Sequence, residues 1–139
     1  MNHTLSSDDK KFKQDVESCA FPASNFDHRA HLRLAYVYLI DNNIETSNKL
    51  VREALYSLLR FNNIEPTAKY HETLTRAWLL AVNYFMSITK STSCADVFID
   101  NNPQMLDSQI MMTHYTKERL FSDKARKIFI EPDLETIPM

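Results

Sequence analysis

The chain of 139 residues contains no glycine. Glycine-rich phosphate loops, type I′ hairpin turns and dinucleotide-binding fingerprints all need the positive φ angles that glycine adopts freely. Their absence favours a helical protein, because asparagine can replace glycine at turns and helix ends. Asparagine pairs divide the chain at wide intervals, and we expect loops at Asn42-Asn43, Asn62-Asn63 and Asn101-Asn102.

Composition and charge narrow the class of protein further. Hydrophobic residues make up 44% and charged residues 24% of the chain, which is typical of one soluble globular domain over residues 1–139. Sixteen basic and eighteen acidic residues give a net charge of -2, so neither nucleic acid nor a membrane surface is an expected partner. The two cysteines form no CxxC motif, and no secretory or membrane-spanning segment is recognisable, so we expect a cytoplasmic location.

Helical periodicity and capping residues predict an all-α fold. We expect a single-domain antiparallel bundle of about five to seven helices, with Ser7 capping the first and Asp27 the second. Proline at residues 132 and 138 indicates an extended C-terminal tail. The predicted helices cover residues 8–19, 27–42, 44–61, 68–89, 93–100, 102–114 and 122–130.

Histidine spacing is the strongest functional signal in the sequence. His28 and His31 are three residues apart in the second predicted helix, a spacing that puts Cβ atoms about 5–6 Å apart on one face. If helices 27–42 and 68–89 run in the same direction in an up-and-down bundle, their first turns lie at one end of it. His71 then joins His28 and His31, and three imidazoles with an open position would bind a divalent metal such as zinc or iron.

Further residues complete this candidate metal site. Glu72 and Tyr115 are candidates for proton transfer beside a metal-bound water, and His114 is a candidate fourth member. A metal-dependent enzyme acting on a small organic substrate is therefore the leading hypothesis. Ordinary structural roles remain open, since Glu72 also has Arg76 four residues later as a salt-bridge partner.

An alternative is a non-catalytic module that binds an anionic small molecule or a partner protein. The first turns of two helices would direct unpaired N–H groups at the same space, which favours anions. Arg29, Arg33 and Arg76 could add bidentate contacts to a carboxylate or phosphate, with Trp78 as a further ligand contact. The same arginines could equally be solvated, and aromatic residues at helical spacing usually pack in the core.

Four blocks of sequence resemble a family of short uncharacterised bacterial all-helical proteins. The resemblance implies that His28, His31, His71 and Glu72 belong to the pattern of the family, whereas His114 occupies a position that is more typically aromatic. It implies no substrate, metal or reaction. The blocks are FDHRAHLRLAYVYL (26–39), KYHETLTRAW (69–78), YTKERLFSDKAR (115–126) and EPDL (131–134).

Overall fold

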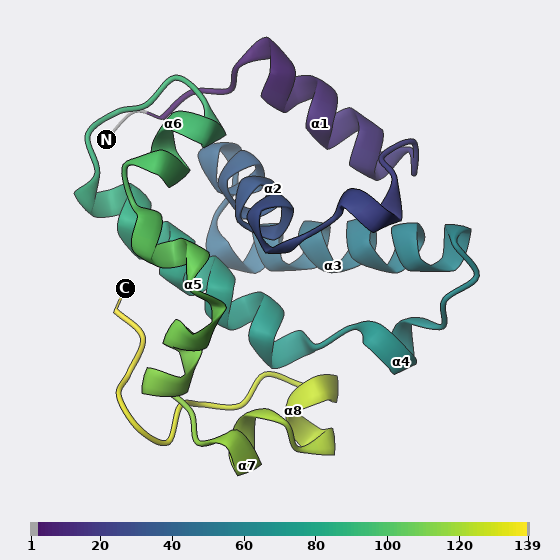
Figure 1. The fold of residues 1–139 in the computed structure, drawn as a ribbon, viewed down its shortest axis with the longest axis vertical. Coiled ribbons are helices and arrows are strands. Elements are labelled where there is room, and N and C mark those ends of the chain that lie inside the picture. Colours follow the sequence, from purple (N-terminus) through teal and green to yellow (C-terminus); the bar gives the residue numbers. More distant parts are fainter. Residues whose placement is uncertain (1–2, 139) are drawn as a thin grey trace.

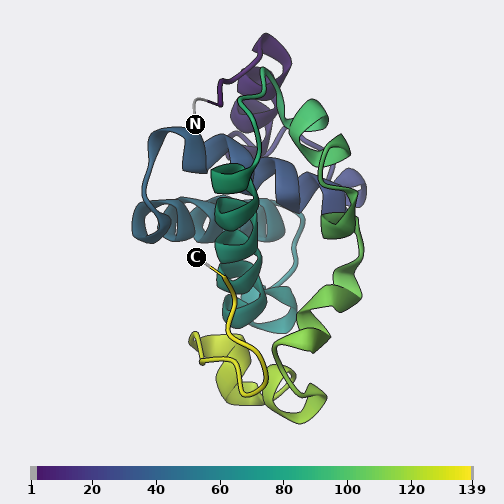
Figure 2. The same cartoon turned by 90° about the vertical axis from the view of Figure 1, so that its left-hand side faces the viewer.

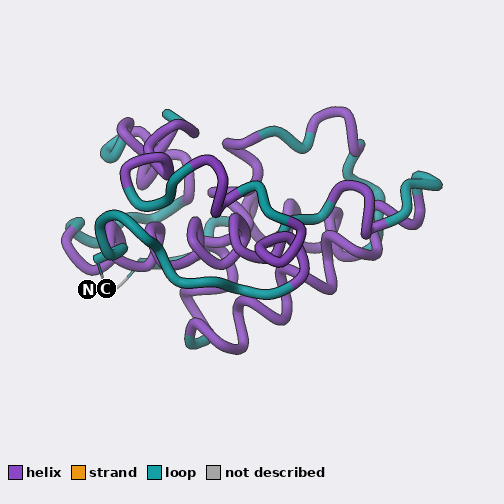
Figure 3. Tube along the Cα trace, turned by 90° about the horizontal axis from the view of Figure 1, so that it is seen from below, coloured by secondary structure: helices purple, strands orange, loops and turns teal. Residues whose placement is uncertain are grey.

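A computed structural model describes residues 3–138 and confirms the all-α fold class (Figure 1). Within these residues the chain forms α-helices and 3₁₀ turns without any strand (Figure 3). The predicted domain over residues 1–139 also includes residues 1, 2 and 139, which lie outside the described range. The four longest helices are α1 (Ser7–Glu17), α2 (His28–Asp41), α3 (Ile44–Phe61) and α5 (Glu72–Ile88).

Capping side chains fix the ends of the first three long helices. Asp27 caps α2 as predicted, and its side chain accepts from the N–H of Ala30. The cap of α1 is Ser6 and not the predicted Ser7, because the Ser6 hydroxyl accepts from the third N–H beyond it. Asn63 has a φ of 61° after α3 and Cys19 has a φ of 64° after α1, so non-glycine residues take the left-handed position that ends a helix.

The predicted helix over residues 68–89 is wrong in one respect, because it is two helices. A single turn, α4 (Pro66–Lys69), is followed by extended backbone at Tyr70 and His71, whose ψ angles are 142° and 106°. The main helix α5 begins only at Glu72. His71 is therefore a capping residue outside the helix, which changes the direction of its side chain.

The second half of the chain is less regular than predicted. Cys94 caps α6 (Ala95–Asp100), where Ser93 was expected. The helix expected over 102–114 is instead a pair of 3₁₀ turns, and Ser122 caps a last helix that stops short of residue 130. A helix that the pattern did not indicate, α7, precedes it. These elements are η2 (Pro103–Leu106), η3 (Ser108–Thr113), α7 (Lys117–Leu120) and α8 (Asp123–Lys127).

Helix α5 is central and contacts α2, α3 and α8 (Figure 2). It runs across α2 and α3, and its two faces serve two separate hydrophobic clusters. The N-terminal core consists of α1, α2, α3, α6 and one face of α5. The C-terminal module, residues 108–138, packs on the other face through six buried side chains: Met111, Tyr115, Leu120, Ala125, Ile130 and Ile137.

No helix between residues 3 and 138 combines the length and the apolar character needed to cross a bilayer.

Candidate functional site

His28 is the first residue of α2 and lies against the middle of α5. Its Nε2 donates to the carbonyl oxygen of Met105 at 2.9 Å, and its ring meets Trp78 edge-on with centroids 4.5 Å apart. Trp78 is partly buried and packs against both hydrophobic clusters. One nitrogen of His28 is thus used to bind the main chain of η2.

His31 lies one turn further along α2, beside the ring of Phe26 at a centroid distance of 4.7 Å. Burial, with a smaller effect of the neighbouring His28, lowers the pKa of His31 to about 4. Its imidazole is therefore neutral at neutral pH.

His71 has both ring nitrogens engaged. Its Nδ1 accepts from the N–H of Leu74 at 3.1 Å, which makes it the N-cap of α5, and its Nε2 donates to the carbonyl of Leu120 at 2.8 Å. The neutral tautomer with a proton on Nε2 satisfies both bonds. Burial lowers the pKa of His71, and the positive charge of Arg126 acts in the same direction.

The three histidines have different surroundings. His28 and His31 share one face of α2, whereas His71 lies against Leu120 and Phe121 of the C-terminal module. The expected convergence of His71 with the other two does not occur, because α5 crosses α2 and its middle, at Trp78, meets the start of α2. Among residues 3–138, no three His, Cys, Asp or Glu side chains form a group that could bind a metal ion.

The two candidate proton-transfer residues, Glu72 and Tyr115, are buried, and their side chains are hydrogen-bonded to other parts of the chain. Glu72 accepts from the Tyr70 hydroxyl at 2.7 Å, from Asn48 Nδ2 at 2.9 Å and from Arg52 at 3.1 Å. The Tyr115 hydroxyl donates to the carbonyl of Ile130 at 2.7 Å, and burial raises the pKa of Tyr115 to about 12.

His114, the candidate fourth member, also binds main chain. Its Nδ1 donates to the carbonyl of Glu135 in the tail at 2.7 Å. In this structure His28, His71, Tyr115 and His114 share one role, since each side chain donates a hydrogen bond to a main-chain carbonyl in the C-terminal third of the chain.

Each candidate anion-binding arginine is paired with a carboxylate. Arg29 donates to Asp96 and Asp100 at 3.0 and 3.1 Å, and Arg33 donates to buried Asp9 at 3.0 Å. Arg76 pairs with Glu45 and not with the predicted Glu72, whose charged partner is Arg52.

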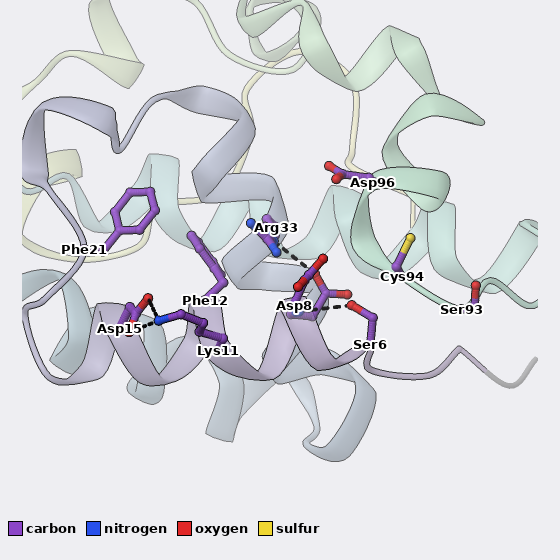
Figure 4. Close-up of a pocket in the computed structure, with 11 residues that line it drawn as sticks. Ser6, Asp8, Lys11, Phe12, Asp15, Phe21, Arg33, Ser93, Cys94 and Asp96 are labelled. Carbon is purple, nitrogen blue, oxygen red and sulfur yellow. Dashed lines mark hydrogen bonds and ion pairs between the residues drawn. The ribbon is translucent and has the colours of Figure 1, made fainter.

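A cavity with a volume of about 660 Å³ lies between α1, α2 and the start of α6 (Figure 4). Asp9 lines it and is only 1% exposed; it accepts from Arg33 and from the N–H of Ala95 at 2.8 Å, so it joins three elements. The complete lining is Ser6, Asp8, Asp9, Lys11, Phe12, Asp15, Phe21, Arg33, Ser93, Cys94 and Asp96.

The cavity is acidic with an aromatic wall. Its lining contains four aspartates, one lysine and one arginine, which gives a formal net charge of -2. Asp15 pairs with Lys11 at 2.9 Å, whereas Asp8 forms no ion pair within the described part of the chain. Phe12 and Phe21 meet edge to face at 5.2 Å, and the guanidinium of Arg33 lies 4.4 Å from the centre of the Phe12 ring.

Sequence reasoning found only Arg33 among the residues that line this cavity. Asp8 and Asp96 are acidic residues in the first turns of α1 and α6, where such residues are common for reasons of helix stability alone. The one available signal was the polar residue Asp9 in the helix over 8–19, next to the apolar stripe that contains Phe12. No spacing rule shows that residues near positions 10 and 95 meet.

In comparisons with known proteins, no family model matches this chain, and neither a curated protein nor a solved structure matches it.

Proposed function

We propose that this chain is a non-catalytic binding module that takes a small organic cation in the cavity between α1, α2 and α6. The observation that supports it is the combination of a concave, net-acidic lining with an aromatic wall. Ligand sites are usually the largest concave surface with a few polar groups that fix orientation. Carboxylates and aromatic faces together attract ammonium and guanidinium groups.

Existing contacts indicate where such a cation would bind. Arg33 already shows the arrangement, since its guanidinium packs on Phe12 while its Nε donates to Asp9. A second cation of similar shape would find Asp8 and Asp15 along the α1 side of the cavity, with Phe21 near Asp15. No histidine, the side chain most used for acid–base catalysis at neutral pH, lines the cavity, which favours binding over acid–base chemistry.

The anion-binding alternative has less support from these contacts. Arg29, Arg33 and Arg76 would each have to leave a carboxylate before binding an anion. The acidic balance of the cavity also repels an anion at close range.

Two probes of matched shape and opposite charge test the proposal. We expect benzamidine, an aromatic cation, to raise the melting temperature, and benzoate to leave it unchanged. Saturating ligand stabilises by RT ln(1 + [L]/Kd), about 2.7 kcal/mol at a hundredfold excess over Kd. The shift should decrease at high salt, since part of the attraction is between exposed charges.

Variants locate the binding. An Asp8→Asn, Asp15→Asn double variant should weaken benzamidine binding at least tenfold in calorimetric titration, while Asp41→Asn, an exposed carboxylate on α2 outside the cavity, should leave it unchanged. Equal effects of benzamidine and benzoate, or full binding by the double variant, would reject the cation site.

The metal-dependent activity predicted from the sequence stays a second candidate. One observation favours it: His28 and His31 lie one turn apart, and His31 is neutral, as a metal ligand must be. Stoichiometric zinc or iron in untagged protein, lost in both His28→Ala and His31→Ala, would support it. Trace metal that neither change affects would argue against it. A cytoplasmic location likewise stays a prediction.

A further inference from the structure

The tail over residues 131–138 lies on the rest of the molecule as a bound peptide would. Its backbone bends at residues 133–135, and it bonds to His114 twice: the main-chain N–H of Leu134 donates to the carbonyl of His114 at 2.9 Å, and the imidazole Nδ1 of His114 donates to the carbonyl of Glu135 at 2.7 Å. The guanidinium of Arg119 donates to the carbonyl of Glu131 at 2.6 Å. The tail is therefore bound in one register.

Two side chains of the tail anchor it at positions four residues apart. The carboxylate of Asp133 accepts from both the N–H and the hydroxyl of Thr116, at 2.8 and 2.6 Å. Ile137 is 7% exposed and belongs to the apolar cluster on α5 that contains Ala77 and Leu80. One carboxylate anchor and one aliphatic anchor within five residues are the elements of a short peptide motif.

The tail does not fill the surface that it covers. A second cavity of about 280 Å³ lies between the tail, α3 and α5, beside Ile137 and Thr136. Ile44, Leu80 and Phe129 supply its apolar lining, and Arg76 with Glu45 its charged edge. A segment with a larger apolar side chain at this point would bury more surface than the tail does.

We propose that this surface, formed by Thr116, Arg119, His114 and the Ala77–Leu80 face of α5, is a docking site for a short acidic segment of a partner protein. The segment carries a carboxylate followed four residues later by an aliphatic side chain, as in Asp133 and Ile137. The tail of the chain occupies the site in cis. An attached segment has an effective concentration in the millimolar range, so a partner binds only when it exceeds the tail in affinity or when the tail is released. This proposal is independent of the cation site.

A labelled peptide with the sequence of residues 129–138 serves as the probe. The full chain carrying Asp133→Ala and Ile137→Ala releases its own tail, and fluorescence anisotropy should then show saturable peptide binding. We expect binding to the unchanged chain to be at least tenfold weaker. A peptide with alanine at position 133 should bind the double variant at least tenfold more weakly, because it lacks the bonds to Thr116.

Controls keep the result decisive. Leu134→Ala removes a tail side chain that is 52% exposed, so this variant should exclude the peptide as the unchanged chain does. Circular dichroism checks that the double variant stays helical; if it does not, Asp133→Asn alone weakens the anchor at constant shape and takes its place. Absence of binding to a folded variant with a released tail, or equal binding to all chains, would overturn the proposal. Dimers of the unchanged chain that disappear in the double variant would assign the site to a second copy instead.

Discussion

The N-terminal core and the C-terminal module share α5 but achieve stability differently. Four helices of 11 to 18 residues make up most of the core, and most of their main-chain groups form bonds within each helix. The module has helices of four and five residues, which leave most of their terminal N–H and C=O groups without an internal partner. A buried main-chain group without a partner is costly, so side chains must supply these bonds.

Thr73 shows how closely α5 is adapted to this need. Its hydroxyl donates to the carbonyl of Ile128 at 2.8 Å and accepts from the N–H of Ile130 at 3.2 Å. Together with His71 and Tyr115 it binds the main chain at the end of α7 and after α8. Histidine, threonine and tyrosine side chains are suited both to catalysis and to hydrogen-bonding main-chain groups. His71, Thr73 and Tyr115 serve the second purpose in this structure.

Replacing a buried leucine by alanine should reveal the largest difference in unfolding behaviour between the two regions. Leu32→Ala in the core and Leu120→Ala in the module remove side chains that are 0% and 1% exposed, each at a cost of about 2–5 kcal/mol. We expect the core change to lower the free energy of global unfolding by that amount. The module change should instead open residues 108–138 locally while core amides keep their protection in hydrogen exchange. Equal loss of protection throughout would show one cooperative unit.

Removal of one hydroxyl should separate the regions at lower cost. Tyr115→Phe leaves the buried carbonyl of Ile130 unpaired, and we expect a loss of about 1–3 kcal/mol. Faster exchange of module amides, with an unchanged core, is the expected readout. Tyr84→Phe is the matched control: Tyr84 is partly exposed on α5, so its loss should stay within about 0.5 kcal/mol. Similar effects of Tyr115→Phe and Tyr84→Phe would argue against a specific role of the Tyr115 hydroxyl in stabilising the module.

Lowering the pH should destabilise the core through His31 and the module through His71. The effect is smallest near neutral pH. The folded-state pKa of His31 is about 4, below the ordinary value of 6.5, so the unfolded chain binds more protons between these values. Its contribution is complete above pH 6.5 and is lost as the pH falls toward 4. His31→Leu should therefore flatten the pH dependence of the urea midpoint over this window. An unchanged slope in that variant would assign the acid sensitivity to other groups.

His71 brings the same sign of pH dependence to the module. Protonation of Nδ1 would end its acceptance from Leu74, and the lowered pKa of His71 puts this loss on the acid side of the ordinary range. Module amides should lose protection as the pH falls, and His71→Asn, which retains a capping acceptor, should reduce this response. Module exchange with the same pH dependence in the variant would contradict it.

Local signals carried most of the fold prediction and little of the site prediction. Asp27 and Asn43 determine helix starts through bonds to residues three positions away, so the bounds of α2 and α3 follow from the sequence. The break at Tyr70 depends instead on a distant contact, since the Tyr70 hydroxyl binds Glu72 within a cluster completed by Asn48 and Arg52 of α3. Periodicity alone continues the helix through that point.

The crossing of α5 over α2 decided the arrangement of the site. An up-and-down bundle would have brought His71 to His28, but the packing of Trp78 against His28 puts the middle of α5 there. Helix crossing depends on the shapes of whole faces, which a spacing rule for two residues does not contain. The cavity was missed for the same reason, since Asp9 and Ala95 meet only through tertiary structure.

Trp78 is the only tryptophan in the sequence, and it packs against both hydrophobic clusters. Its indole therefore gives the molecule a built-in optical probe at the boundary between core and module. Opening of the module alone would admit water on one side of the ring and shift its emission to the red before the helices melt. Trp78 emission followed during unfolding thus distinguishes separation of the module from the core, with the helices intact, from melting of the helices.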